Sequence, residues 1–294
     1  WGLTQNRCQK WNHHYSGGVQ SDSGHISLMY GIIPTRGNML NIDQYNITSR
    51  PIDIFKKNGY QIIGVSTSSF KYCWAFGRDC EMHRRIFDTF ITVPTDYIDL
   101  VKREEWIAKE AAKLITTITG PYVMIINFDA THYPYSYPSK FEKFKPVIDT
   151  KSVSDLIHHI KSSSSNDNKQ TSFKIINRYK NAALYLDYLI NRYILQNLTK
   201  NDIFMLTSDH GEFLGEYGRL GHTLHEYYEE QTHVGAIFCA PFMLNRDDEP
   251  STHIDVLSSI LEPYLGHNIL TGDGLHRSLY KINQQQPELN QQQQ

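Results

Sequence analysis

Short apolar runs alternate with amphipathic segments along this chain. Runs bounded by polar or turn-forming residues predict four buried strands, at residues 59–67, 122–129, 202–207 and 234–240. Apolar residues at helical spacing predict helices at residues 51–58, 104–118, 173–198 and 253–265. Apolar strands that alternate with helices are typical of the α/β class, here a three-layer αβα sandwich with a mainly parallel central sheet.

The strongest candidate for chemistry is the segment 207–222, TSDHGEFLGEYGRLGH, which begins where a predicted strand ends. In parallel sheets, functional groups collect just beyond the carboxyl ends of the strands. Asp209 and His210 fall at that edge, and a carboxylate beside an imidazole suits zinc or another divalent metal. Gly211 allows a sharp turn, and the loop after it is able to return His222 to the same site. Taken alone, an Asp-His pair is more often part of an ordinary surface loop.

Composition narrows the function classes. The 29 basic and 31 acidic residues give a formal net charge of -2, so no basic excess points to a nucleic-acid partner. Fourteen histidines weakly favour a metal or catalytic site. The four cysteines show no CxxC spacing, which argues against a zinc ribbon or a thioredoxin-type motif. Cys73 and Cys80 either close a small loop or are free buried thiols.

The length of 294 residues suits one large domain, predicted over residues 1–282, followed by a Gln-rich disordered tail at 283–294. The polar insertion at residues 162–170 is expected to be a surface loop. The apolar runs are too short to cross a bilayer. Because the chain starts at Trp1 and not at Met, we expect upstream segments, with membrane helices possible among them.

Three segments in order resemble the sulfatase/alkaline-phosphatase superfamily. SDHGEFLGEYG, then GH, then YYEEQTHV and the strand GAIFCAPF resemble its C-terminal metal-binding signature, except that Gly235 stands where the family usually has proline. FDATHYPYSYP resembles its H-x-P-Y turn, and NHHYSGGVQSDSGHISLMYGIIP its nucleophile turn and helix. The resemblance implies that Asp209 and His210 bind a divalent ion (Zn, Mn, Ca or Mg), that His222 is a ligand or oxyanion binder, and that His132 contacts the substrate.

The same resemblance puts Ser21 at the nucleophile position and as a third metal ligand, with Ser23 ranked second; the bland alternative for Ser21 is a helix N-cap. True sulfatases have a cysteine there, oxidised to formylglycine under a C/S-x-P-x-R motif. This chain reads Ser21-Asp22-Ser23-Gly24-His25, with neither the proline nor the arginine. Sulfate-ester hydrolysis through formylglycine is therefore disfavoured. A metal-activated hydroxyl nucleophile suits phosphatases and phospho-group transferases instead.

One family feature is missing from the sequence. The superfamily's first strand ends in an acidic metal ligand upstream of the nucleophile, whereas residues 1–11 contain no acidic residue and no apolar strand. We therefore expect this first strand and its ligand to be absent from the sequence, through truncation or loss. The narrower resemblance is to sulfatase-like periplasmic domains of Gram-negative inner-membrane proteins that govern lipopolysaccharide and cardiolipin.

Two functions follow from these resemblances. The first is a metal-dependent hydrolase or transferase for a phosphoryl or sulfuryl ester, acting on an anionic ester substrate or lipid headgroup at the periplasmic face of the inner membrane. The alternative is an inactive domain that binds a lipid or partner protein at a membrane surface.

Overall fold

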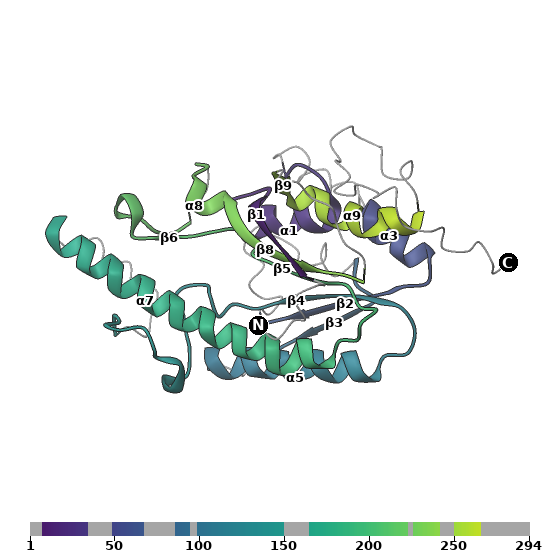
Figure 1. The fold of residues 1–294 in the computed structure, drawn as a ribbon, viewed down its shortest axis with the longest axis horizontal. Helices are drawn as coiled ribbons and strands as arrows, with labels where there is room; N and C mark the ends of the chain where they lie inside the picture. The colour runs from purple at the N-terminus through teal and green to yellow at the C-terminus, as the bar shows by residue number, and fades with distance from the viewer. Residues whose placement is uncertain are drawn as a thin grey trace.

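The computed structural model describes residues 8–34, 49–67, 86–94, 99–149, 165–222, 226–241 and 250–265. These residues form an α/β fold in which the strands lie between two sets of helices (Figure 1). The predicted fold class is therefore confirmed. Within this part of the chain, no helix is long and apolar enough to cross a membrane.

The strands of the described residues form two main sheets and a small hairpin, not one continuous central sheet. The first sheet has the order β5-β8-β1-β9, and β8 is antiparallel to both β5 and β1. The second sheet has the order β3-β2-β4 and is entirely parallel. The strand bounds are β1 Cys8–Tyr15, β2 Gln61–Ser66, β3 Thr89–Thr92, β4 Tyr122–Asn127, β5 Phe204–Thr207, β6 Phe213–Leu214, β7 Leu220–Gly221, β8 His233–Cys239 and β9 Ser251–Thr252.

Helices lie on both sides of these strands, as Figure 1 shows with α1, α3 and α9 above and α5 and α7 below. Ile62 of β2 packs toward α1, α3 and α9, whereas Ile63 and Val65 pack against α5 and the π-helical turn η3. Side chains alternate along a strand, so this one strand supplies both cores. The main helix bounds are α1 Ser21–Tyr30, α3 Arg50–Lys57, α5 Leu100–Thr117, α7 Ser165–Leu189, η3 Ile190–Ile194, α8 Glu229–Thr232 and α9 His253–Leu265.

Two predicted segments differ in the structure. The expectation that the strand ahead of Ser21 is absent is wrong, because β1 runs from Cys8 to Tyr15 and leads to α1. Its sequence CQKWNHHY is mostly polar, and only Trp11 and His14 are buried, so it lacks the apolar run that reveals the other strands. The insertion at 162–170 is not a loop throughout, because α7 begins at Ser165. The Gln-rich tail lies outside the described residues.

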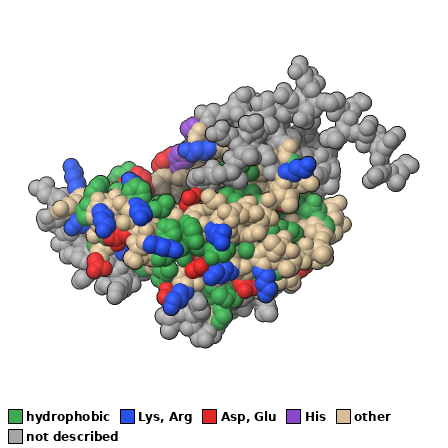
Figure 2. Space-filling model, turned by 60° about the horizontal axis from the view of Figure 1, so that its bottom comes forward, with side chains coloured by type: hydrophobic (Ala, Val, Ile, Leu, Met, Phe, Trp, Pro, Cys, Tyr) green, Lys and Arg blue, Asp and Glu red, His purple; other side chains and the backbone are tan. Residues whose placement is uncertain are grey.

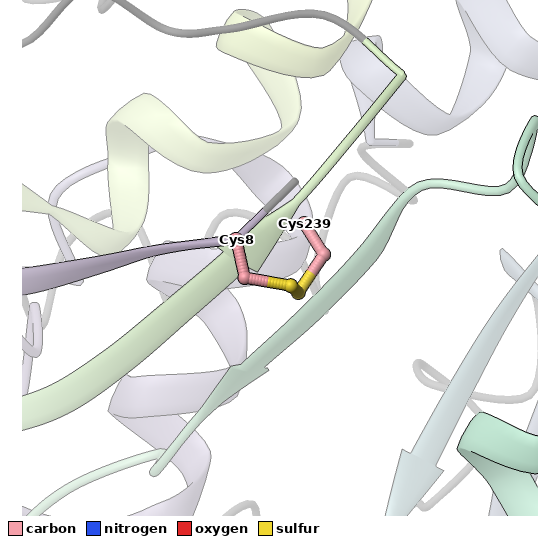
Figure 3. Close-up of a disulfide and its surroundings, with 2 residues drawn as sticks. All are labelled: Cys8 and Cys239. Carbon is pink, nitrogen blue, oxygen red and sulfur yellow. A yellow bond between two sulfur atoms is a disulfide. The ribbon is translucent and has the colours of Figure 1, made fainter. Parts of the chain in front are cut away.

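A disulfide that the sequence analysis did not predict joins Cys8 of β1 to Cys239 of β8 (Figure 3). The two residues are directly opposite each other in the antiparallel pair, and their Cα atoms are 4.0 Å apart. Cys73 and Cys80 lie outside the described residues. The structure thus ties the strand that leads to Ser21 to a strand more than 200 residues later, at a sequence separation of 231.

Basic and acidic side chains are interspersed on the face that α5 and α7 present (Figure 2). Several of them form ion pairs along α5, such as Lys109 with Glu105 at 3.0 Å. This face therefore agrees with the near-neutral composition.

Candidate active site

The five predicted site residues come together from four connections of the chain. Ser21 is the first residue of α1, just after β1, and Asp209 and His210 follow the carboxyl end of β5. The remaining two are His132, in the loop after β4, and His222, directly after β7. The hairpin β6-β7 is what returns the chain from Asp209 to His222, as the glycine-rich sequence predicted.

Ser21, Asp209 and His210 form the first group. Oγ of Ser21 lies 3.3 Å from Nε2 of His210, and that Nε2 lies 3.6 Å from Oδ2 of Asp209. Nδ1 of His210 is 2.8 Å from the carbonyl oxygen of Gly211. A carbonyl only accepts hydrogen bonds, so Nδ1 carries the proton and the Nε2 lone pair faces Ser21 and Asp209. This is the tautomer that a metal-binding histidine uses.

Asp209 is held in its ionised form. Its Oδ1 accepts the backbone N–H of His210 at 3.0 Å, which leaves Oδ2 directed at the histidines. Burial acts to raise the pKa of this carboxyl, but the imidazoles of His210 and His25, a hydrogen bond from Ser21 and the His210 N–H together lower it to about 2. Asp209 is therefore a carboxylate at neutral pH, as a metal ligand must be.

The helix start assigns different tasks to the two candidate serines. The N-cap of α1 is Gln20, so the N-cap alternative for Ser21 is wrong: Ser21 is the first helical residue, with its hydroxyl in the site. Ser23, the third helical residue, completes a capping box with Gln20 instead. Its Oγ donates to the carbonyl of Gln20 at 3.0 Å and accepts the Gln20 N–H at 3.3 Å. The geometry therefore favours Ser21 over Ser23 as the nucleophile.

His132 and His222 form a second group with Glu212. Each of these three side chains offers one atom that could bind a metal, and these three atoms all lie within 4.8 Å of one another. The His222 ring is 4.6 Å from the His210 ring and 6.5 Å from the His132 ring, measured between centroids, so the two groups adjoin. Nδ1 of His132 is 2.8 Å from the Tyr133 carbonyl, which leaves its Nε2 lone pair available.

Glu212 is only partly satisfied by hydrogen bonds. Its Oε2 accepts the Tyr135 hydroxyl at 2.7 Å, while its Oε1 is buried without a hydrogen-bond partner among the described residues. Burial raises the pKa of Glu212, against the charge of His132 and the Tyr135 hydrogen bond, which lower it. A buried carboxylate oxygen with no donor is costly unless a cation or proton occupies its place.

Both groups fit a divalent cation. The first group offers one carboxylate, one imidazole and the Ser21 hydroxyl, and the second offers one carboxylate and two imidazoles. Zinc and related ions accept such mixed oxygen and nitrogen sets. The lone pairs of His210 and His132 are fixed by carbonyl partners, and Glu212 offers an unsatisfied buried oxygen. The residues present therefore suit a metal at Asp209 and His210, and the adjoining group offers a second position.

Two side chains at the site were missed by the sequence analysis. Glu212 stands one residue after the DHG motif, and His25 stands four residues after Ser21, where its Nε2 is 3.9 Å from Oδ2 of Asp209. The i, i+4 spacing of Ser21 and His25 on one helix face was a signal that could have found His25. The loop Phe70–Arg85, considered for substrate binding, lies outside the described residues.

Comparisons with known proteins bear on this arrangement. Residues 3–264 match the family model described as Sulfatase. The phosphoethanolamine transferase EptA of Salmonella typhimurium is 29% identical over 143 residues, which cover 46% of this chain and 24% of the transferase. Human iduronate 2-sulfatase is 23% identical over 267 residues, covering 70% of this chain and 46% of the sulfatase. The matches thus span less than half the length of these curated relatives.

Solved structures resemble the chain in fold. The C-terminal periplasmic domain of EptC from Escherichia coli, solved in complex with zinc, gives a TM-score of 0.64 at 13% identity, over 88% of this chain and 72% of that one. The soluble domain of lipooligosaccharide phosphoethanolamine transferase A from Neisseria meningitidis gives 0.62 at 17% identity, over 87% and 77%. At such low identity these likenesses show the fold alone, and they confirm the one predicted.

Proposed function

This chain belongs to the Sulfatase family, and we propose that it is a metal-dependent enzyme that transfers or hydrolyses a phosphoryl ester through Ser21. One observation carries the proposal: the Ser21 hydroxyl lies 3.3 Å from a His210 nitrogen whose lone pair is aimed at it, beside the ionised Asp209. A serine that only capped a helix would not need the carboxylate of Asp209 and the imidazole of His210 beside its hydroxyl. The pairing of a nucleophile with its activating site supports chemistry over binding alone.

Asp209, His210 and Ser21 would hold the ion. When bound there, a divalent ion supplies the positive charge that lowers the pKa of the Ser21 hydroxyl and offsets the charge of the transferred group. Ser21 Oγ then forms a bond to phosphorus while the bond from phosphorus to the leaving oxygen breaks. Ser21 also opens the ten-residue helix α1, whose N-terminal N–H groups favour an anionic phosphoryl group at this point.

His132 and His222 lie where the rest of the ester would sit. His132 is exposed, and its Nε2 is left toward the site because Nδ1 is bonded to the Tyr133 carbonyl. In its protonated form it would donate to the leaving oxygen, so that the proton lost from Ser21 is balanced by the proton gained by the leaving alcohol. Water or an acceptor hydroxyl then displaces Ser21 Oγ from phosphorus and restores the enzyme.

The proposed substrate is a phosphodiester of a lipid headgroup. A serine nucleophile without the proline and arginine of the formylglycine motif favours phosphoryl over sulfuryl transfer. Relatives named as phosphoethanolamine transferases, one of them for lipooligosaccharide, support a phosphoethanolamine-type donor. By the same analogy we propose the periplasmic face of the inner membrane as the location, with attachment through segments outside this sequence.

The test compares the wild-type chain with Asp209→Ala for metal content by mass spectrometry and for turnover. The substrates would be p-nitrophenyl phosphate, bis-p-nitrophenyl phosphate, p-nitrophenyl sulfate and a phospholipid panel. Asp53→Ala, on α3 and outside the site, is the matched control. We expect one to two equivalents of metal and phosphoester turnover in the wild type and the control, and loss of both in Asp209→Ala.

The alternative, an inactive binding domain, rests on the lack of any acidic residue between Cys8 and Gln20, ahead of the nucleophile. It would be supported if the wild type carried no metal and turned over none of these esters. Turnover of the sulfate ester alone would keep the metal site and overturn the choice of phosphorus over sulfur.

A further inference from the structure

A cavity of about 90 Å³ lies between the start of α5 and the loop that follows β4. Arg103 and Glu104 line it from α5, and Asp129, His132 and Tyr133 are among the residues that line it from the loop. Roughly 10–15 Å³ is enough to hold one water molecule, so this cavity has room for several atoms of a ligand. Because His132 belongs both to the candidate active site and to this cavity, a substrate at the site is able to extend into it.

The carboxyl of Glu104 is buried at this cavity, and one of its two oxygens has no hydrogen-bond partner. The residue is only 3% exposed. Its Oε1 accepts the backbone N–H of Asp129 at 3.1 Å, whereas its Oε2 is buried without a partner among the described residues. The bond to Asp129 joins α5 to the loop, and residues on both sides of that bond line the cavity, so we place Oε2 at the cavity wall. A buried oxygen of this kind costs free energy unless a ligand satisfies it.

The charges at the cavity favour a cationic ligand. Burial and the nearby charge of Asp129 raise the pKa of Glu104 well above its usual value, against the N–H groups of Asp129 and Ala130 and the charge of Arg103. Glu104 therefore holds a proton when no cation is beside it, and a cation that binds there takes the place of that proton. The Nη2 of Arg103 donates to the Thr67 carbonyl, and its Nε is buried without an acceptor among the described residues. A ligand with both a cation and an oxygen acceptor satisfies both side chains.

We propose that this cavity binds the aminoethyl group of a phosphoethanolamine-type ester, with the ammonium at Glu104 and Asp129 and the ester oxygen toward Arg103. The inference deepens the proposed function and rests on it, because it names the part of the substrate that the chain recognises. The binding step itself requires neither the metal ion nor Ser21, so it is open to a separate test.

An organic cation suits this cavity better than a metal ion does. Among the described residues, three metal-binding side chains come close together only in the group that contains His132, and Glu104 and Asp129 are not part of it. Two carboxyl groups alone leave most positions around a metal ion unfilled. An ammonium group instead donates three hydrogen bonds and is attracted to an aromatic ring, which Tyr133 supplies at the cavity. Ala130 adds an apolar surface for the two methylene groups.

The first test is the binding of ethanolamine by the chain freed of metal. Ethylene glycol is the reference ligand, because it has the same number of heavy atoms and no charge. Saturation transfer from the protein to the ligand methylenes, measured by NMR at increasing ligand concentration, gives both affinities. We would compare wild type, Glu104→Gln and Asp129→Asn, with Glu110→Gln as the matched control, because Glu110 is on α5 and pairs with Lys113. Circular dichroism would check folding, and Asp129→Asn carries the test if Glu104→Gln does not fold.

We expect wild type and Glu110→Gln to bind ethanolamine about 10-fold or more tightly than ethylene glycol, as a hydrogen bond between charged groups provides. Glu104→Gln should lose most of this preference, since an amide carries no charge and its nitrogen does not accept a hydrogen bond. Equal binding of the two ligands by the wild type would overturn the inference. An unchanged preference in the folded cavity variants would overturn it too.

A second measurement separates this inference from the proposed function. The metal-loaded chain would be given two p-nitrophenyl phosphodiesters, one with an aminoethyl group and one with a propyl group of the same size. We expect kcat/KM to favour the aminoethyl ester about 10-fold or more in the wild type, and less in Glu104→Gln. Equal kcat/KM for the two esters would overturn the inference and leave the proposed function standing. Turnover of neither ester, with the preference for ethanolamine intact, would contradict the proposed function and support the cavity as a binding site.

Discussion

Gly24 of α1 packs directly against the backbone carbonyl of Asp209: a Cβ atom at position 24 would lie 2.2 Å from that oxygen. The obstacle is backbone and not a flexible side chain, so it cannot rotate away. The hydroxyl of Ser16, just ahead of α1, donates to the same carbonyl at 2.5 Å. Helix α1 and the turn that carries Asp209 are therefore in direct contact through main-chain atoms, and this contact helps to set the distance between Ser21 and Asp209.

Gly24→Ala should consequently push α1, which carries Ser21, away from the turn that carries Asp209. Alanine normally favours a helix by about 1 kcal/mol over glycine, yet here we expect a loss of about 1–3 kcal/mol of unfolding free energy from overpacking. Metal affinity should fall with it. Gly235→Ala on β8 is the control, because nothing lies within 4 Å of its added Cβ atom. Equal unfolding free energies of the two variants in denaturant titrations would contradict the close contact between Gly24 and the Asp209 carbonyl.

Ser21→Ala should mainly lower turnover, whereas Ser23→Ala should mainly lower stability. Removing the Ser21 hydroxyl should lower turnover by about 10³-fold or more, as loss of a nucleophile does, while Asp209 and His210 retain most metal affinity. Removing the Ser23 hydroxyl should cost about 1 kcal/mol of stability through the lost cap and leave kcat nearly unchanged. Steady-state kinetics and chemical denaturation would be measured on both. The reverse pattern would assign the nucleophile to Ser23.

His253 should make the fold sensitive to acid. The ring is fully buried between α1 and the turn before Asp209, with Nε2 3.0 Å from the Ser208 carbonyl and Nδ1 3.3 Å from Ser27 Oγ. Burial lowers its pKa from 6.5 to about 4. Below pH 6.5 the unfolded chain binds a proton that the folded chain refuses, so stability falls between pH 6.5 and 4 and not above 6.5.

The full loss from this histidine is on the order of 3 kcal/mol. Denaturant titrations with chelator present, from pH 8 to pH 4, would measure it, and His253→Gln should remove that part of the slope. His13→Ala is the matched control, as its ring is exposed. An unchanged slope in His253→Gln would mean that other groups account for the acid sensitivity.

Tyr135→Phe should disturb Glu212 without changing the shape of the core. The Tyr135 ring is fully buried, and its hydroxyl is the donor to Glu212 Oε2 at 2.7 Å. Without it, the carboxyl loses a contact that lowers its pKa, and we expect about 1–3 kcal/mol of destabilisation. Zinc binding by the group of His132, Glu212 and His222 should then require a higher pH. Tyr185→Phe, whose hydroxyl donates to the Val101 carbonyl, is a control outside the site.

The Cys8–Cys239 disulfide should stabilise the β1-β8 pair. Reduction, or the Cys8→Ser variant, should lower the unfolding free energy by about 2–4 kcal/mol. The bond lies at the start of β1 and the end of β8, at the opposite end of β1 from Ser21, so turnover near room temperature should change little. Peptide mapping under non-reducing conditions would detect the linked pair; its absence in oxidised protein would contradict the assignment.

The local pattern of apolar and polar residues was enough to predict the helices and strands that carry a clear apolar face or run. The helix predicted at 253–265 is found as α9 with the same bounds. The strands β2, β4 and β5 lie within the predicted apolar runs, and β8 begins one residue before its predicted run. A strand that is covered on both faces carries apolar residues at consecutive positions, and such a run can be recognised from the sequence alone. The order of motifs also pointed to Ser21, Asp209, His210, His132 and His222, and the structure places these side chains in two adjoining groups, while their roles stay predictions.

The tertiary structure decided what periodicity does not encode. The strand β1 is polar and was missed because only Trp11 and His14 are buried, a consequence of its place between β8 and β9. The pairing of Cys8 with Cys239 joins segments 231 residues apart, so no local spacing predicts it. Such contacts follow from the order of strands in the sheet, which brings the ends of distant segments to one edge.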